Sequence, residues 1–216
     1  MVKADAKNSS SAEEVYQALR EHILDCSYKP GSVLNERRLA EEFGMSRTPI
    51  REAIYKLEVE GLVKRYPNVG IIVTELTVRD VMESFQVREL LEPYAARLAT
   101  SVLDKNKLEY LLKVFEELIS TSDQEELPYK KHCDFDTELH DIIVRATDNS
   151  KMISIMKQMC ASVERLRWIG VKVRYKESTI EHRDIIKAML SGDLDCVEQR
   201  MLEHLRNAKQ RLIHSV

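Results

Sequence analysis

Residues 36–62 constrain the fold of this chain more than any other stretch, because their apolar and basic positions follow the pattern of two short helices joined by a tight turn. Leu39 and Phe43 place apolar side chains on one face of the first helix. Gly44 follows where a left-handed turn residue is needed, a conformation that glycine adopts at little cost. The stretch therefore predicts a helix pair with a defined turn.

The second helix of this pair carries both start signals and cations. Ser46 stands at the N-cap position, and Pro49 falls in the first turn, where its missing N–H costs little. Arg47 and Arg51 lie off the apolar face. This is typical of a helix-turn-helix whose second helix reads the major groove, since an arginine can donate two bonds to guanine. The hydroxyls of Ser46 and Thr48 suit phosphate oxygens.

Two β-rich runs come after the second helix and predict a hairpin. They cover residues 62–63 and 71–73, with the turn formers Pro67, Asn68 and Gly70 between them. A hairpin in this position is the wing of a winged helix. The alternative is a small helical subdomain with a hairpin and no role in nucleic-acid binding. The agreement of turn, cap, cations and wing favours DNA binding.

Residues 30–63 resemble the DNA-binding domain of GntR-type bacterial transcription regulators. The matching run is PGSVLNERRLAEEFGMSRTPIREAIYKLEVEGLV, and SRTPIREA is its centre. Many members carry a basic residue just before the wing glycine, whereas this chain has Val69 there, which argues against a strong contact of the wing tip with the minor groove. The resemblance implies operator contacts for seven residues, with Ser46 at the phosphate position and Gly70 as the wing glycine: Arg37, Ser46, Arg47, Thr48, Pro49, Arg51 and Gly70.

Composition limits the class of protein. A length of 216 residues allows one large domain or two small ones, and the 32% of charged residues with only 6 glycines favours helix. The net charge is −3, so binding to DNA would depend on a local basic patch and on salt, because neutralised phosphates release counterions.

The cysteines and the apolar runs indicate the cellular compartment. No pair among the cysteines has C-x-x-C spacing, which argues against a thiolate zinc site and against a disulfide framework, and reduced cysteines fit the cytosol. No apolar run approaches the roughly 20 residues of a membrane span. We therefore expect a cytoplasmic protein that does not contact a membrane.

The fold class that we predict is mainly α, with an N-terminal winged helix-turn-helix followed by an all-α antiparallel bundle of about six helices. The first domain covers residues 1–75 and opens with a helix over 11–26. The second, residues 76–216, is expected to bind an effector and to dimerise. Pro93 should interrupt and kink the first bundle helix. Helical periodicity places the bundle helices at residues 77–102, 107–120, 129–146, 150–172, 176–190 and 194–213.

Metal-competent side chains lie on the apolar sides of three bundle helices. Asp136 and His140 share one helix face by their i, i+4 spacing, and His182 and His204 lie on apolar faces of two other helices. Each group buried without a partner would cost about 1–3 kcal/mol, which a divalent ion would remove. Satisfied core histidines are the alternative. His132 lies one turn before Asp136; it either approaches this site or, as we prefer, lies at the surface.

Residues 77–213 resemble the all-helical FCD effector domain of the FadR-type branch of GntR regulators. The matching segments are FQVRELLEPYAARLA, FDTELHDII, IEHRDIIKAML and the helix with His204. Many members bind a divalent metal through one aspartate and three histidines. The resemblance therefore implies zinc or nickel held by Asp136, His140, His182 and His204.

Arg88 is the remaining inward-facing residue that is a candidate for effector binding. The family uses an arginine at this position to hold an effector carboxylate, and a bidentate arginine–carboxylate pair is strong in a low-dielectric pocket. The alternative is a salt bridge to Glu92 at i+4. We favour the effector role.

Together these features predict a ligand-responsive DNA-binding transcription regulator, a repressor in most members of the family. It should bind a palindromic operator as a homodimer, because two half-sites need two reading helices at a fixed spacing. A small carboxylate bound near the metal would control it. One alternative is the same regulator with a purely structural metal. The other is a metal-dependent hydrolase, but the chain lacks an evident general base and nucleophile motif, so we predict that it is not an enzyme.

Overall fold

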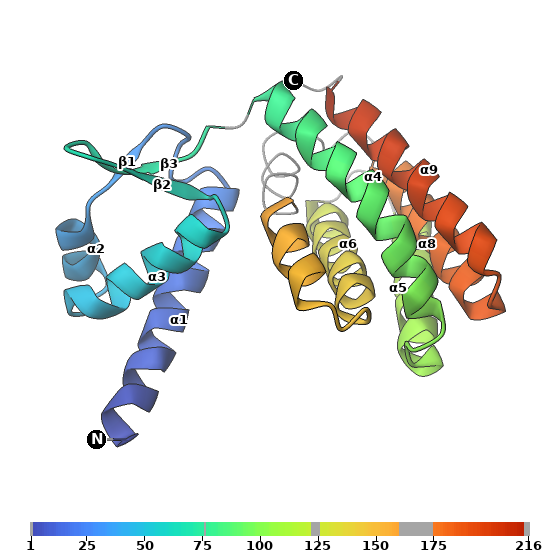
Figure 1. Ribbon diagram of the computed structural model, residues 1–216, viewed down its shortest axis with the longest axis horizontal. Coiled ribbons are helices and arrows are strands. Elements are labelled where there is room, and N and C mark those ends of the chain that lie inside the picture. Colours follow the sequence, from blue (N-terminus) through green and yellow to red (C-terminus); the bar gives the residue numbers. More distant parts are fainter. Residues whose placement is uncertain (1, 76, 122–125, 160–174, 214–216) are drawn as a thin grey trace. The chain divides into compact units, whose positions relative to one another are not determined.

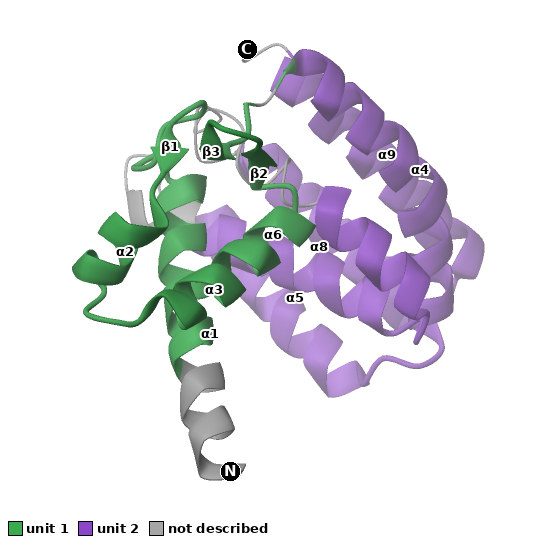
Figure 2. Ribbon diagram, turned by 60° about the vertical axis from the view of Figure 1, so that its left-hand side comes forward, with its two compact units in different colours: residues 1–77 green, residues 78–216 purple. Residues whose placement is uncertain are grey.

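The computed structural model describes residues 2–75, 77–121, 126–159 and 175–213 (Figure 1). The chain divides into two compact units, residues 1–77 and 78–216 (Figure 2). Unit 1 combines helices with a small sheet, and unit 2 is helical in its described residues. The predicted fold class, mainly α with a winged helix-turn-helix before a helical bundle, is confirmed.

Unit 1 has a three-stranded antiparallel sheet in the order β1-β3-β2. The hairpin of β2 and β3 is the predicted wing. β1 was not predicted, because its two residues form a strand only through pairing of Val33 with Ile72. The elements of unit 1 are α1 (Val2–Leu24), β1 (Val33–Leu34), α2 (Glu36–Glu42), α3 (Arg47–Val59), β2 (Val63–Tyr66) and β3 (Gly70–Val73).

The turn between α2 and α3 has the geometry that the sequence predicts. Gly44 has φ 62°, in the left-handed region. Ser46 is the N-cap of α3 with extended backbone, as predicted, although its side chain makes no capping hydrogen bond. α1 also differs from the prediction, since it begins at Val2 rather than at residue 11.

Helix α3 is fixed by its packing on α1. Ile50, Ile54 and Leu57 on one side of α3 are completely buried, as are Val15 and Leu19 of α1. Burial of each such side chain contributes about 1.5–3 kcal/mol relative to exposure. The opposite side of α3 faces solvent, where Arg51 pairs with Glu36 and Lys56 pairs with Glu13.

A buried polar contact also joins α1 to the end of α3. The Tyr16 hydroxyl donates a short hydrogen bond to Glu60, and Arg20 Nε lies 3.2 Å from the other Glu60 oxygen. Burial and the Glu60 carboxylate raise the pKa of Tyr16, so the phenol remains a donor. These hydrogen bonds join α1 to the C-terminal end of α3 and satisfy the buried Glu60 carboxylate, which apolar packing could not do.

Unit 2 contains the six predicted bundle helices within its described residues (Figure 1). α4 continues through Pro93, so the predicted interruption is wrong, while the predicted kink stays a prediction. Glu92 and Ala95, on either side of the proline, are completely buried, so packing holds the helix on both sides. The helix that starts at residue 150 is described to residue 159, and the rest of its predicted span lies outside the described residues. The others are α4 (Val78–Thr100), α5 (Lys105–Ser120), α6 (Glu126–Arg145), α8 (Tyr175–Ser191) and α9 (Leu194–Ile213).

The packing in unit 2 pairs α4 with α9 and α5 with α8, while α6 contacts α4, α5 and α8. Apolar side chains such as Phe85, Phe115, Leu139 and Ile185 are fully buried between them. Ionisable groups from α4, α6, α8 and α9 are buried within the same interior. These groups form the site considered next.

Among the described helices, none combines the length with the apolar composition that crossing a membrane requires.

Candidate metal centre and nucleic-acid interface

Five metal-competent side chains are buried in unit 2. α6 contributes three of them at one-turn intervals, which puts all three on one helix face. α8 and α9 contribute one imidazole each. None of the five is more than 4% exposed: His132, Asp136, His140, His182 and His204.

The donor atoms form two overlapping groups that share His182. One group joins it with His140 and His204, and the other joins it with His132 and Asp136; within each group all chosen donor atoms lie within 4.8 Å of one another. His182 Nε2 is 3.3 Å from His140 Nε2 and 3.6 Å from Asp136 Oδ2. Two ligands of one ion, each bonded at about 2.0–2.2 Å, can lie no farther apart than about twice that length. The spacing of these atoms is therefore compatible with a shared ion.

The structure brings the four predicted ligands into one neighbourhood and adds His132. The preferred surface interpretation of His132 is wrong, since the side chain is 4% exposed. Its Nε2 lies 3.8 Å from Asp136 Oδ2, and its ring centroid is 5.6 Å from that of Tyr175. The position of His132 one turn before Asp136 was the only signal in the sequence that it could join the site. Its burial depends on contacts with Tyr175 and Thr179 of α8.

Two carboxylates hold the second nitrogens of the predicted ligands. His140 Nδ1 makes a short contact with Glu92, and His204 Nδ1 lies 2.8 Å from Glu181 Oε2. An imidazole that donates Nδ1–H to a carboxylate presents its Nε2 lone pair on the other side, which is the form that binds a metal. Sequence reasoning missed Glu181 entirely and considered Glu92 only as a partner of Arg88.

Both carboxylates are ionised at neutral pH despite their burial. Burial raises the pKa of Glu92, but the charge of Arg88 and the contact with His140 outweigh this effect, so the pKa lies well below its usual value. Burial likewise raises the pKa of Glu181, but hydrogen bonds from Arg211 and His204 outweigh it and lower the pKa to about 2. Each carboxylate is thus held between an arginine and a histidine of the cluster.

The histidines are suited to a divalent cation. Burial lowers the pKa of His182 and of His204, which keeps both imidazoles neutral at pH 7, as metal binding requires. His204 Nε2 is buried and has no hydrogen-bond partner in the described part of the chain. Since buried polar atoms are nearly always paired, the buried Nε2 of His204 fits the role of a metal ligand. Imidazole and carboxylate donors without a thiolate suit zinc or nickel.

The stability of the ion-free protein should fall as pH decreases from 7.5 to 5.5. His182 and His204 have lower pKa values in the folded chain than the usual 6.5, so below that pH the unfolded chain binds more protons and folding becomes less favourable. Each group contributes at most about 1.4 kcal/mol per pH unit. Glu92 and Glu181 titrate at lower pH and do not contribute in this window. Urea denaturation in chelator at three pH values measures the slope.

The matched controls for this slope are His182→Leu and His22→Gln. The first removes one of the two imidazoles whose pKa burial lowers and should flatten the dependence on pH, whereas the second changes a histidine of unit 1 and should leave the slope unchanged. A wild-type slope that stays flat between pH 7.5 and 5.5 would show that the imidazoles are not held neutral by burial.

The predicted DNA contacts form an exposed surface around the turn and the start of α3. Arg37, Arg47 and Thr48 are exposed, as are Ser46 and Arg51. Pro49 is buried in the first turn of α3, and Gly70 lies half-buried at the start of β3 with φ 114°.

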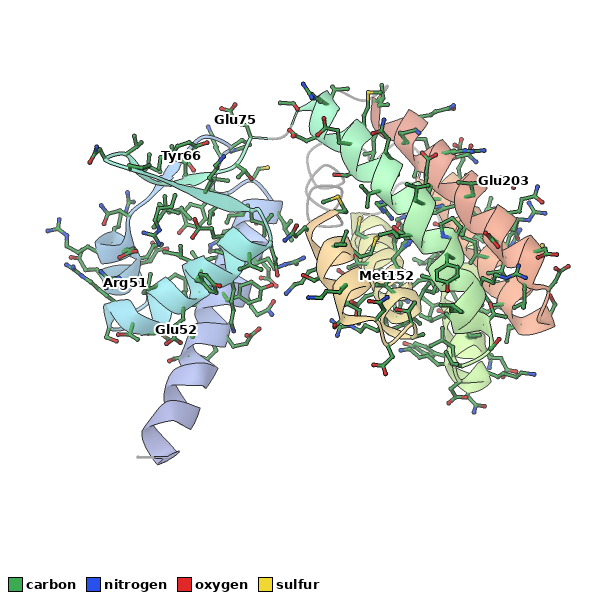
Figure 3. All side chains as sticks on the ribbon, viewed as in Figure 1. Arg51, Glu52, Tyr66, Glu75, Met152 and Glu203 are labelled. Atoms are coloured by element: carbon green, nitrogen blue, oxygen red, sulfur yellow. The ribbon has the colours of Figure 1, made fainter. Side chains whose placement is uncertain are left out.

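Glu36 connects this surface to the wing. Its carboxylate accepts a hydrogen bond of 2.8 Å from Arg51 Nε and one of 3.3 Å from Arg65 Nη1 on β2. The hydrogen bond from Arg51, helped by Arg65, lowers the pKa of Glu36, although partial burial opposes this shift. Figure 3 labels Arg51 on α3 and Tyr66 at the end of β2. Sequence reasoning did not identify Glu36 or Arg65, because they meet only when β2 returns to α2.

Comparisons with known proteins match each of the two units to a protein family. Residues 83–207 match the FCD domain family, and residues 11–73 match the family described as bacterial regulatory proteins, gntR family. The chain belongs to the GntR family. It is a transcription regulator with an FCD domain, as the resemblance implied, and the related proteins are transcription regulators rather than enzymes.

Two relatives cover nearly the whole GntR-family chain. The uncharacterized HTH-type transcriptional regulator YdhC of Bacillus subtilis is 29% identical over 208 residues, which span 93% of this chain and 90% of YdhC. The HTH-type transcriptional repressor RspR of Escherichia coli is 26% identical over 200 residues, which span 92% of this chain and 87% of RspR.

Solved structures share the fold. Escherichia coli McbR/YncC has a TM-score of 0.78 at 20% identity and covers 94% of this chain and 97% of its own. The Zn²⁺-bound FCD domain of TM0439 has a TM-score of 0.52 at 21% identity and covers 65% of this chain and 96% of its own. GntR regulators bind DNA, and the residues that match this family, 11–73, lie in unit 1.

Proposed function

We propose that this regulator is a cytoplasmic repressor that binds a palindromic operator as a homodimer and is controlled by a small carboxylate bound beside a divalent metal in unit 2. The buried cluster of imidazoles around Asp136 carries the proposal, because His204 Nε2 has no other partner among the described residues. RspR, one relative, is named a repressor, and one FCD neighbour was solved with Zn²⁺.

The ion would be held by Asp136, His140, His182 and His204, as a zinc or nickel site of nitrogen and oxygen donors. When bound, it would supply a Lewis-acidic centre, and an ion that takes more than four ligands could also accept a carboxylate oxygen. Glu92 and Glu181 orient two of the imidazoles through their Nδ1 atoms. Such outer partners usually change metal affinity by about 10- to 100-fold.

Arg88 would hold the effector carboxylate. Its guanidinium is 1% exposed, lies 5.0 Å from the centre of the Phe85 ring and donates from Nε to Glu92. The salt bridge that was the alternative for Arg88 is thus present, and it is compatible with effector binding because a guanidinium has five donors. An effector that bonds to Arg88 would act on Glu92, and through Glu92 on His140.

In this proposal, operator binding depends on the arrangement of two reading helices. An operator with two half-sites requires two copies of α3 at a fixed spacing, and the resemblance assigns contacts to Arg37, Ser46, Arg47, Thr48, Pro49, Arg51 and Gly70. Effector binding changes operator affinity only by as much as the effector prefers one arrangement of the dimer over the other. Residues 74–77, which connect the two units, are the segment through which this preference would act.

Thermal unfolding against a panel of small carboxylates, with and without a chelator, tests the effector and the metal together. We expect one class of acid to stabilise the metal-loaded protein by about 2.7 kcal/mol at a hundred times its dissociation constant, and to have no effect on the chelated protein. Arg88→Lys should weaken this response, whereas the exposed Arg79→Lys should not.

The alternatives predict different unfolding curves. If chelation lowers stability but no acid has an effect, the metal is structural and the effector proposal fails. Turnover of an ester or amide that disappears in His182→Ala would instead favour a hydrolase.

A further inference from the structure

His132 lies beyond the four ligands that the family resemblance implies, yet it is buried in the same cluster. We propose that His132 is a fifth protein ligand of the metal centre. This inference rests on the proposed function, because it requires that an ion binds in unit 2.

The position of His132 in the fold supports this role. It precedes Asp136 by one turn of α6, and its Nε2 lies 3.8 Å from Asp136 Oδ2. It forms a compact group with Asp136 and His182, whereas Asp136 is not part of the group that contains His204. The carboxylate therefore lies between two sets of imidazoles, and one of those sets includes His132.

The hydrogen bond on the far side of the ring determines which nitrogen faces the cluster. The Thr179 hydroxyl donates its single proton to the Tyr175 carbonyl at 2.7 Å. The same hydroxyl oxygen lies 2.9 Å from His132 Nδ1, so it accepts from Nδ1–H. A neutral His132 therefore carries its lone pair on Nε2, the atom that lies toward Asp136.

This arrangement repeats what is found at two of the predicted ligands. His140 and His204 also use Nδ1 for an outer acceptor, Glu92 and Glu181, and direct Nε2 toward the cluster. An outer acceptor that orients a histidine is characteristic of metal ligands. A divalent cation near both His132 Nε2 and the Asp136 carboxylate would be attracted to both. His132 thus has the environment of a ligand.

A fifth protein ligand would change which ion the site prefers. It would also limit how many effector oxygens can bind to that ion. Four protein ligands complete a tetrahedral ion such as zinc, whereas four imidazoles with one carboxylate suit a six-coordinate ion. Only one position would then be open for a water molecule or for a single carboxylate oxygen. We therefore expect Ni²⁺ or Co²⁺ to bind in preference to a strictly tetrahedral ion.

Cobalt binding to the full-length protein tests this ligand. The protein is stripped with chelator and titrated with Co²⁺, while the visible absorption spectrum reports coordination number and calorimetry reports affinity. His132→Gln should lower Co²⁺ affinity at least about 10-fold and should strengthen the visible bands, because cobalt absorbs more intensely with fewer ligands. Thr179→Val keeps the imidazole and removes only its acceptor, so it should weaken binding less and keep the wild-type spectrum.

Three outcomes overturn the proposal in distinguishable ways. A wild-type spectrum with wild-type affinity in His132→Gln removes His132 from the centre. A lower affinity with an unchanged spectrum makes His132 a positioning residue rather than a ligand. If the wild-type protein binds no cobalt, nickel or zinc at all, the metal centre of the proposed function fails as well. Circular dichroism of the ion-free variants establishes that they are folded.

Discussion

Glu92→Leu should destabilise unit 2 by about 3–5 kcal/mol, the cost of leaving one member of a buried ion pair without its partner. Glu92 is 0% exposed and Arg88 is 1% exposed, and the two side chains are bonded across one turn of α4. Removing the carboxylate leaves the guanidinium buried without its counter-charge. Urea denaturation of the ion-free protein at pH 7.5 measures this loss.

The same substitution should weaken metal binding by about 10- to 100-fold, because His140 Nδ1 loses the carboxylate that orients it. The double variant Arg88→Met/Glu92→Leu separates the two effects. It replaces both buried charges with apolar groups, which is often neutral for stability. We expect the double variant to recover most of the stability but not the metal affinity. Recovery of both would mean that Glu92 affects the ion only through folding.

The DNA-binding half of the fold could be predicted because its signals are local. The turn requires a residue with positive φ, which Gly44 provides, and the stripe of Ile50, Ile54 and Leu57 indicates the buried side of α3. β1 could not be predicted in the same way, because two residues have no periodicity and become a strand only when β3 pairs with them.

The metal centre was predictable only in part. The i, i+4 spacing puts Asp136 and His140 together within one helix, but nothing local brings His182 and His204 to them; the family resemblance supplied that convergence. The outer partners Glu92 and Glu181 belong to other helices than the imidazoles they hold. The burial of His132 likewise depends on contacts with α8, which sequence spacing does not encode.

A common feature of the two units is a carboxylate that orients a functional cation or imidazole. Glu36 bonds to Arg51 Nε in unit 1, as Glu92 bonds to His140 in unit 2. In both places the carboxylate accepts a hydrogen bond from one nitrogen of the side chain. This bond fixes the direction in which the remaining nitrogens of that side chain point. For Arg51 these are the two Nη groups, which are the donors that a guanine edge requires. If Arg51 reads a base edge as proposed, its side chain is partly oriented before DNA binds.

Arg47→Ala and Arg51→Ala should each weaken operator binding by about 1–3 kcal/mol, roughly 10- to 100-fold, if the start of α3 reads base edges. Both side chains are exposed on unit 1, and truncating them removes no buried contact, so the fold should be retained. Fluorescence anisotropy measures affinity for a duplex that the wild-type protein selects from a random library. Arg79→Ala is the matched control, since this exposed arginine of α4 pairs with Glu83 in unit 2.

The salt dependence of binding and the sequence preference distinguish contacts with base edges from contacts with phosphates. A base-reading arginine changes which duplexes are preferred, whereas an arginine that contacts phosphate weakens all duplexes alike and lowers the salt slope by about one. We expect Arg51→Ala to relax sequence preference, because its Nη groups are already directed by Glu36. Unchanged affinity in both variants would exclude α3 as the reading helix, and with it the assignment of the contacts around its first turn.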